Sequence, residues 1–307
     1  MKKYHIILSL LAAVVVFSVV FTACQKSNNN PSDTISAQDD LTLQASATVD
    51  DESDNAYNDV TNNVLGVNDD AGIGTGIGVF LTAPHTSNGT PVNQFGDGED
   101  SVGHCYKITS DPDRANTFPK TITIDFGSGC TGKDGHTRRG KIITVYTGHM
   151  RDAGSSATTT FDGFYIDSIK VEGTLSIQNN STSSGLVFTV TITNGKLSDP
   201  SGDYAEINRT RTWTQTAGSS TPHDPIDDIY SITGSSSGTA QVLGITIQWT
   251  STITTPVVRK MTCRWAVSGQ VTITRSNKTA VLDYGNGDCD NQATVTVGSK
   301  VHNITLH

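Results

Sequence analysis

Apolar and polar residues alternate along most of the chain from about residue 105 onward. Such alternation places one set of side chains on each face of a β-strand. Clusters of Gly, Asn, Asp and Ser interrupt the alternating stretches and indicate turns, for example at residues 234–238. The pattern predicts strands at residues 120–126, 141–147, 169–177, 186–193, 207–214, 245–253, 270–274, 279–284 and 293–297.

These strands predict an all-β fold. No long stretch of helical periodicity separates them, so a parallel sheet built from βαβ units is not expected. Many strands place Thr opposite Val or Ile, which is typical of a sheet with one buried and one solvated face. We therefore expect residues 105–307 to form an antiparallel meander, folded as a sandwich or a partly closed barrel.

One short helix is expected before the strands, at residues 50–65. Its apolar residues recur at helical spacing and are Ala56, Tyr57, Val60 and Val64. Four acids at its start suit the positive end of a helix, and they are Asp50, Asp51, Glu52 and Asp54. A Gly-rich stretch follows, so residues 49–104 are expected to hold this helix and an irregular lead-in to the strands.

The first residues have the pattern of a secretory leader. Lys2 and Lys3 precede an apolar run at residues 6–21, and Ala23-Cys24 follows. The Ala-Cys junction resembles the lipobox of bacterial lipoproteins, which implies that residues 1–23 are a signal peptide and that Cys24 is acylated. The alternative is an uncleaved membrane helix, but the apolar run is short for a span and no basic cluster follows it.

Residues 24–48 are rich in Asn, Ser, Asp and Gln and predict a flexible, lipid-anchored tether. Residues 25–72 hold ten acids and one base, while the whole chain has a net charge of −9. The acidity is thus expected to belong to the tail rather than to the folded body. No dense basic patch is present, so nucleic acid is not an expected partner.

The cysteines follow an internal repeat. Lys120-Thr-Ile-Thr-Ile-Asp-Phe-Gly-Ser-Gly-Cys130 matches Lys278-Thr-Ala-Val-Leu-Asp-Tyr-Gly-Asn-Gly-Asp-Cys289 with one inserted residue. Each copy also has an upstream Cys at nearly equal spacing, so the repeat favours disulfides Cys105–Cys130 and Cys263–Cys289 among the three connectivities. The second pair lies symmetrically about a predicted turn at Ser276-Asn277, which places its cysteines opposite each other.

No spacing of a nucleophile and base, of metal ligands or of a phosphate-binding loop occurs, so no catalytic residue, metal or cofactor is predicted. Arg209, Arg211 and Trp213 share one strand face, where they can hold a glycan or an anionic ligand. The simpler alternative is an exposed sheet face whose long side chains cover an aromatic ring. Two polar clusters remain. Residues 223–228 are interpreted as a solvated loop, and residues 286–290 as a tight turn.

Several strings of the body, among them Val171-Glu-Gly-Thr-Leu, Asp227-Asp-Ile-Tyr-Ser-Ile-Thr-Gly and Asp283-Tyr-Gly-Asn-Gly-Asp-Cys, resemble a group of uncharacterised Bacteroidota lipoproteins with Thr-rich all-β bodies. The resemblance implies attachment to the outer membrane through the N-terminal lipid. Our first hypothesis is a non-catalytic protein that binds or scaffolds a glycan or an envelope protein. The second is a glycan hydrolase with an unrecognised pair of carboxylates.

Overall fold

The computed structural model describes residues 35–66, 105–132, 134–183, 185–221, 227–242 and 244–306. These residues form one helix and one antiparallel sheet of 14 strands, which confirms the predicted fold class. The leader with Cys24, the Gly-rich lead-in at residues 67–104 and most of the polar cluster at residues 223–228 lie outside the described residues.

The sheet is a meander in which each strand pairs with the next along the chain, except that β2 pairs with β4 and β3 pairs only with β4. Its strands are β1 (Lys107–Asp111), β2 (Lys120–Asp125), β3 (Cys130–Thr131), β4 (Thr137–Tyr146), β5 (Ser156–Ile166), β6 (Ile169–Asn179), β7 (Val187–Ser198), β8 (Tyr204–Ala217), β9 (Ile229–Val242), β10 (Ile245–Lys260), β11 (Ser268–Arg275), β12 (Lys278–Asn286), β13 (Gln292–Val297) and β14 (Lys300–Thr305).

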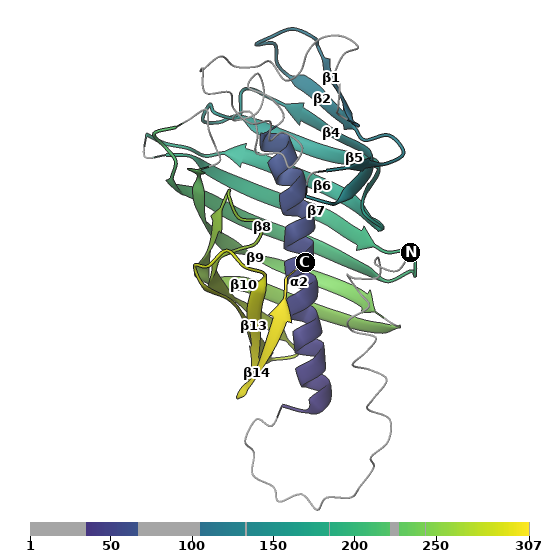
Figure 1. Ribbon diagram of the computed structural model, residues 1–307, viewed down its shortest axis with the longest axis vertical. Coiled ribbons are helices and arrows are strands. Elements are labelled where there is room, and N and C mark those ends of the chain that lie inside the picture. Colours follow the sequence, from purple (N-terminus) through teal and green to yellow (C-terminus); the bar gives the residue numbers. More distant parts are fainter. Residues whose placement is uncertain are drawn as a thin grey trace, which may run out of the picture.

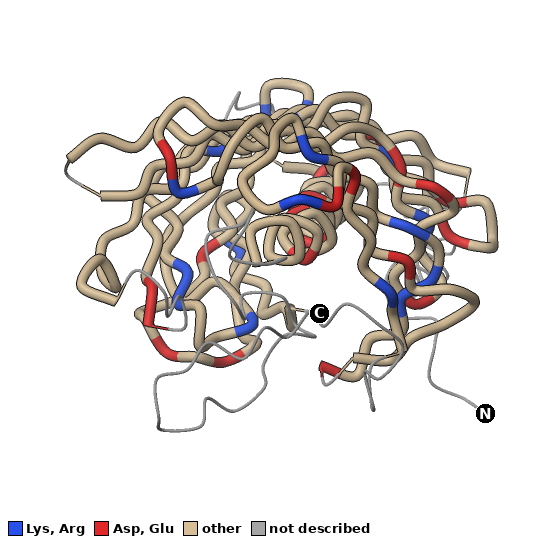
Figure 2. Tube along the Cα trace, turned by 90° about the horizontal axis from the view of Figure 1, so that it is seen from above, with Lys and Arg blue, Asp and Glu red and all other residues tan. Residues whose placement is uncertain are grey.

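The sheet curves around helix α2 (Ala37–Leu65), which lies along its concave side (Figure 1 and Figure 2). Strands β1 and β14 are the two edges and do not pair with each other, so the sheet is not closed into a barrel. A single curved sheet around a helix, rather than two stacked sheets, therefore encloses the core.

All nine predicted strands are present, and β1, β3, β5, β9 and β14 were not predicted. The turn expected at residues 234–238 is wrong, because these residues lie inside β9. Gly234 has a φ of 136°, and a Cβ at this position would lie 2.1 Å from the carbonyl oxygen of Thr210 on β8. The absence of a side chain at Gly234 thus permits two central strands to approach closely, and it does not mark a turn.

Helix α2 is longer than predicted, and this corrects the boundary of the expected tether. It begins after Ser36, whose hydroxyl accepts a hydrogen bond from the backbone N–H of Asp39, and ends before Gly66. Residues 37–48 are therefore helical, and most of them are buried or half-buried. The acids at residues 50–54 lie in the middle of the helix and not in its first turn.

Small polar residues allow this helix to be buried without a continuous apolar stripe. The hydroxyls of Ser46, Ser53 and Thr61 each donate a hydrogen bond to the carbonyl oxygen four residues earlier. These bonds satisfy the hydroxyls inside the helix itself. Among the described residues no helix is long and apolar enough to cross a membrane.

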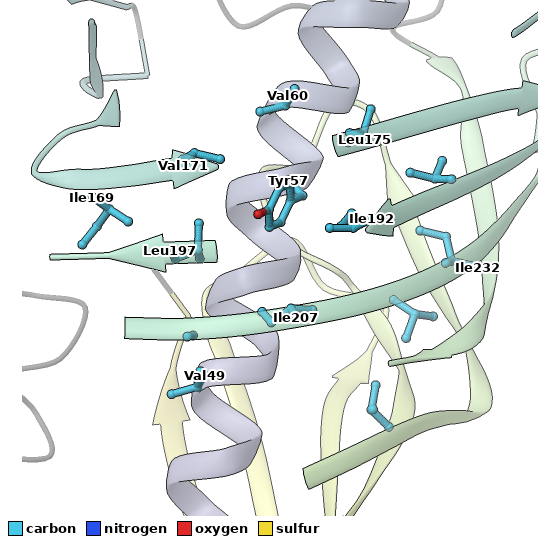
Figure 3. Close-up of a cluster of buried hydrophobic side chains, with 14 of the residues drawn as sticks. Val49, Tyr57, Val60, Ile169, Val171, Leu175, Ile192, Leu197, Ile207 and Ile232 are labelled. Carbon is cyan, nitrogen blue, oxygen red and sulfur yellow. The ribbon is translucent and has the colours of Figure 1, made fainter. Parts of the chain in front are cut away.

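The apolar core lies between α2 and the concave face of the sheet (Figure 3). Tyr57 and Val60 of α2 point toward Ile192, Val171 and Leu175 of the sheet. The Tyr57 hydroxyl donates a hydrogen bond to the carbonyl oxygen of Glu172 at 2.7 Å. The phenol therefore fills apolar space with its ring and ties the helix to β6 with its hydroxyl.

Both predicted disulfides are present. Cys105–Cys130 and Cys263–Cys289 have Cα–Cα distances of 5.2 and 5.7 Å. Ser276 and Asn277 have φ values of 48° and 62° and form the turn between β11 and β12. Each disulfide thus joins the chain before one strand of a hairpin to the chain after the next strand, as the repeat predicts.

Candidate functional site

Acidic residues of α2 form ion pairs with basic residues of the sheet at both ends and in the middle of the helix. At the N-terminal end Asp39 pairs with Lys278, and Asp40 accepts from Lys300 at 2.9 Å. Near the C-terminal end Asp59 pairs with Arg138, which also contacts Asp134 at 2.8 Å. The expectation that the acids form a solvated tail is wrong for residues 39–59, because the concave face supplies their counter-charges.

The middle of this interface is the most deeply buried, and we call it the buried charge cluster. Three acids of α2 and three arginines of the sheet form it: Asp50, Asp51, Asp54, Arg209, Arg211 and Arg259. Asp50, Asp51 and the three arginines are each buried. Charged groups are expensive to bury unless each is paired or hydrogen-bonded, so this cluster is the strongest candidate for a functional site.

Asp50 is the central acceptor of the cluster. Its Oδ1 accepts from Ser236 Oγ at 2.6 Å, from Trp249 Nε1 at 3.0 Å and from Arg209 Nη2 at 3.2 Å. Burial by itself would raise the pKa of Asp50, but Arg209 and Arg211 outweigh it and hold the pKa below its ordinary value. Asp50 is therefore a buried carboxylate that carries its charge.

Asp54 and the backbone complete the contacts of the two arginines on β8. Arg209 Nη1 lies 2.9 Å from Asp54 Oδ1, and Arg211 Nη2 lies 3.3 Å from Asp54 Oδ2. Arg209 Nη2 also donates to the carbonyl oxygen of Asp50 at 2.8 Å. One turn of α2 is thus held to β8 by two guanidinium groups.

Asp51 behaves differently from its neighbours. Its Oδ1 accepts a hydrogen bond from the Tyr284 hydroxyl at 2.8 Å. Burial raises the pKa of Asp51 to about 7, and the nearby charges of Asp54 and Asp50 act in the same direction. Asp51 therefore changes its charge near neutral pH, while Asp50 beside it does not.

Arg211 and Arg259 have buried donors without acceptors among the described residues. Arg259 Nη2 donates to the carbonyl oxygen of Arg264 at 3.3 Å, but its Nε has no partner. Arg211 Nε and Nη1 also have none. Both side chains line a small cavity between α2 and the sheet, together with Trp213 and Tyr284.

The predicted ligand-binding residues Arg209, Arg211 and Trp213 do share one face, but that face is not exposed. Their exposed fractions are 3%, 3% and 2%, and the two arginines contact α2 rather than solvent. These residues therefore form neither an open ligand-binding face nor an exposed face whose long side chains cover an aromatic ring. The correction follows from the phase of the strand, because Ile207 and Ala205 alternate in step with them and are buried too.

Trp249 is buried, and a glycine makes room for it. Gly238 lies directly opposite on β9, where a Cβ would come within 2.3 Å of the indole ring. The indole N–H can therefore reach Asp50. Sequence patterns miss this arrangement, although the phase shared by Ile247, Trp249 and Ser251 places them on one face.

A second cavity lies on the other side of α2 and is mostly apolar in its lining. Glu52 and Asp199 line it, together with Val49, Leu197 and Tyr204. Burial raises the pKa of Glu52 well above its ordinary value, with a smaller effect from Asp51. Asp199 is engaged in its own turn, where its Oδ1 accepts from the backbone N–H groups of Ser201 and Asp203.

No group of three metal-binding side chains occurs in the part of the chain that the structure describes. Asp290 accepts from the backbone N–H of Gln292 at 2.9 Å, in keeping with the tight turn expected at residues 286–290.

No family model, curated protein or solved structure matches the chain. The interpretation of the site therefore depends on its own chemistry.

Replacement of Asp50 tests the role of the cluster in stability. Asp50→Asn keeps the shape of the side chain but leaves Arg209 and Arg211 with less counter-charge in a buried site. Breaking one partner of such a network costs about 3–5 kcal/mol, so the free energy of unfolding in urea should fall by that amount. The control is Asp125→Asn, whose half-exposed pair with Lys141 at 3.5 Å should contribute about 0–1 kcal/mol. Equal losses in both variants would contradict this role for Asp50.

Replacement of Asp51 tests its proton. Because the folded state raises the pKa of Asp51 from 3.8 to about 7, the folded protein keeps a proton that the unfolded chain releases. This contribution to stability is present at low pH and is lost as the pH rises through about 7. Asp51→Asn removes this dependence of the free energy of unfolding on pH. The variant should thus gain up to about 4 kcal/mol relative to wild type between about pH 4 and pH 8.

The measurement is urea unfolding of both proteins across this pH range. The pKa of Glu52 is raised in the same direction, but mainly by its own burial, which both proteins share, so most of its contribution cancels in the difference. Two stability curves that stay parallel with pH would show that Asp51 does not hold this proton.

Proposed function

We propose that the chain is a lipid-anchored cell-envelope protein whose curved sheet binds an uncharged glycan without catalysis. Export is supported by the leader, by the lipobox-like Ala23-Cys24 junction and by the two disulfides. Disulfides persist in oxidising compartments outside the cytoplasm. Helix α2 starts at Ala37, only a short stretch of chain after Cys24.

The observation that carries the binding function is a row of hydroxyl groups on the outer face of the sheet, away from α2. It crosses seven consecutive strands, β5 to β11, through directly opposed residues. None of the seven is buried. They are Thr158, Ser176, Thr191, Thr210, Ser235, Thr252 and Thr272.

A second row runs parallel to it on the same face. Ser237, Thr250, Thr274 and Thr279 are directly opposed across β9 to β12. Neighbouring positions repeat at about 4.8 Å between strands and about 6.8 Å along a strand. Hydroxyls both donate and accept hydrogen bonds, so this surface offers regularly spaced, uncharged partners to the hydroxyls of a sugar chain.

The contrast between the two faces supports the choice of ligand. The arginines and the acids of the buried charge cluster lie between helix and sheet, where a large ligand does not reach them. The rows on the outer face contain only uncharged residues. An uncharged glycan fits this surface better than an anionic polymer, which would select Lys or Arg.

Substitution within the row tests the glycan-binding face. The triple variant Thr191→Val, Thr210→Val and Thr252→Val removes three hydroxyls but keeps β-branched side chains. Each lost hydrogen bond is worth about 0.5–1.5 kcal/mol, so affinity for a glycan identified on an array should fall about tenfold or more. The control variant, Thr294→Val with Thr296→Val on β13, should bind normally.

Thermal unfolding should be nearly unchanged in both variants, because the altered side chains lie outside the core. Unchanged glycan affinity in the triple variant would exclude the hydroxyl row as the binding face. Failure to bind any glycan, with capture of an envelope protein instead, would replace the proposed ligand by a protein.

The anchor is tested at Cys24. Cys24→Ser should accumulate as an unprocessed precursor and should incorporate no labelled palmitate, since the thiol is the acylated group. Ser27→Ala, three residues later, should be processed and labelled normally. Cleavage of Cys24→Ser at the same bond would show that the leader is an ordinary signal peptide.

A further inference from the structure

The cavity beside the buried charge cluster is a confined polar space. It lies between α2 and strands β8, β10 and β12, and its polar lining residues include Asp51, Asp54, Arg211 and Arg259. The space open to the centre of a water-sized particle is about 20 Å³. That volume suits one water or one monatomic ion.

The unpartnered groups at this cavity are all donors. Arg211 Nε, Arg211 Nη1 and Arg259 Nε have no hydrogen-bond partner among the described residues. The two side chains are only 3% and 7% exposed. Buried polar groups are nearly always hydrogen-bonded, and a guanidinium group keeps its protons. Two arginines that line one cavity with unmatched N–H groups therefore indicate an acceptor between them.

The charge balance of the cluster indicates the sign of that acceptor. The three arginines face the carboxylates of Asp50 and Asp54, which form ion pairs with Arg209 and Arg211. They also face a third acid, Asp51, whose charge changes near neutral pH. When Asp51 is protonated, the cluster carries one excess positive charge. A buried excess charge costs several kcal/mol unless a counter-ion compensates it.

We propose that a monatomic halide, chloride in the natural environment, binds in this cavity between Arg211 and Arg259. The donors recognise a negative acceptor, the volume suits a monatomic ion, and the indole of Trp213 forms part of the wall. The halide neutralises the excess charge of the cluster and so joins β8 and β10 beneath the helix.

Halide binding is coupled to the proton on Asp51. The charged and titratable groups that surround Asp51 come from the helix and from three strands, and they are Asp50, Glu52, Asp54, Arg209, Arg259 and Tyr284. Below about pH 7 the protonated Asp51 leaves room for one anionic charge. Above that pH the carboxylate of Asp51 supplies this charge itself and repels the halide.

Thermal unfolding of the purified full-length chain tests the site. Sodium bromide should raise the Tm in a saturable way compared with sodium gluconate at equal ionic strength, because a ligand that binds only the folded state stabilises it. The increment should be larger at about pH 6 than at about pH 8.5. Asp51→Asn should keep the increment at both pH values.

Arg259→Met should lose the bromide increment, whereas Lys141→Met, on the exposed side of β4, should keep it. Since Arg259→Met can also destabilise the fold, anomalous diffraction from bromide-soaked crystals of the unaltered protein provides an independent measurement. A bromide peak within hydrogen-bond distance of Arg211 and Arg259 is the expected result. Water alone in the cavity, or equal bromide increments in wild type and Arg259→Met, would overturn the proposal.

Discussion

The contact between the acidic helix and the concave face of the sheet is the interaction on which the rest of the structure depends. Asp50 is its centre, since one carboxylate accepts from a serine, an indole and an arginine that come from three adjacent strands, β8, β9 and β10. A curved, open sheet of this length has an apolar inner face that must be covered. The helix covers it, and its ion pairs determine where along the face each turn lies.

This interaction also separates the two faces of the sheet by chemistry. Long-range ion pairs gather charge on the inside, as Arg209 shows with its exposed fraction of 3%. Cross-strand pairs of hydroxyls, such as Thr191 with Thr210, remain on the outside. Several ion pairs are thus buried beneath the helix, whereas in most soluble folds charged groups lie mainly on the surface. The proposed glycan surface and the proposed halide site are the two consequences of this arrangement.

Burial of so many charged groups also explains why neighbouring carboxyl groups within one turn of the helix differ in pKa. Asp50 faces two arginines and keeps its charge, whereas Asp51 faces a phenol and has a pKa of about 7. Adjacent positions on a helix point about 100° apart, so neighbouring acids enter different surroundings. The sequence shows four acids close together in this turn, but only the fold places Asp50 against arginines and Asp51 against a phenol.

Local patterns determined much of the sheet and the disulfides. Alternation identified strands such as β6 and β13, and the repeat identified both cystine pairs, because strand pairing and hairpin symmetry act over short stretches of chain. The length of α2 and the burial of Arg209, Arg211 and Trp213 were decided only by the tertiary structure. Alternation states which side chains share a face, but not what covers that face. The covering element is a helix about 160 residues away in sequence. Its low apolar content is compatible with burial because Arg209 and Arg211 pair with its acids.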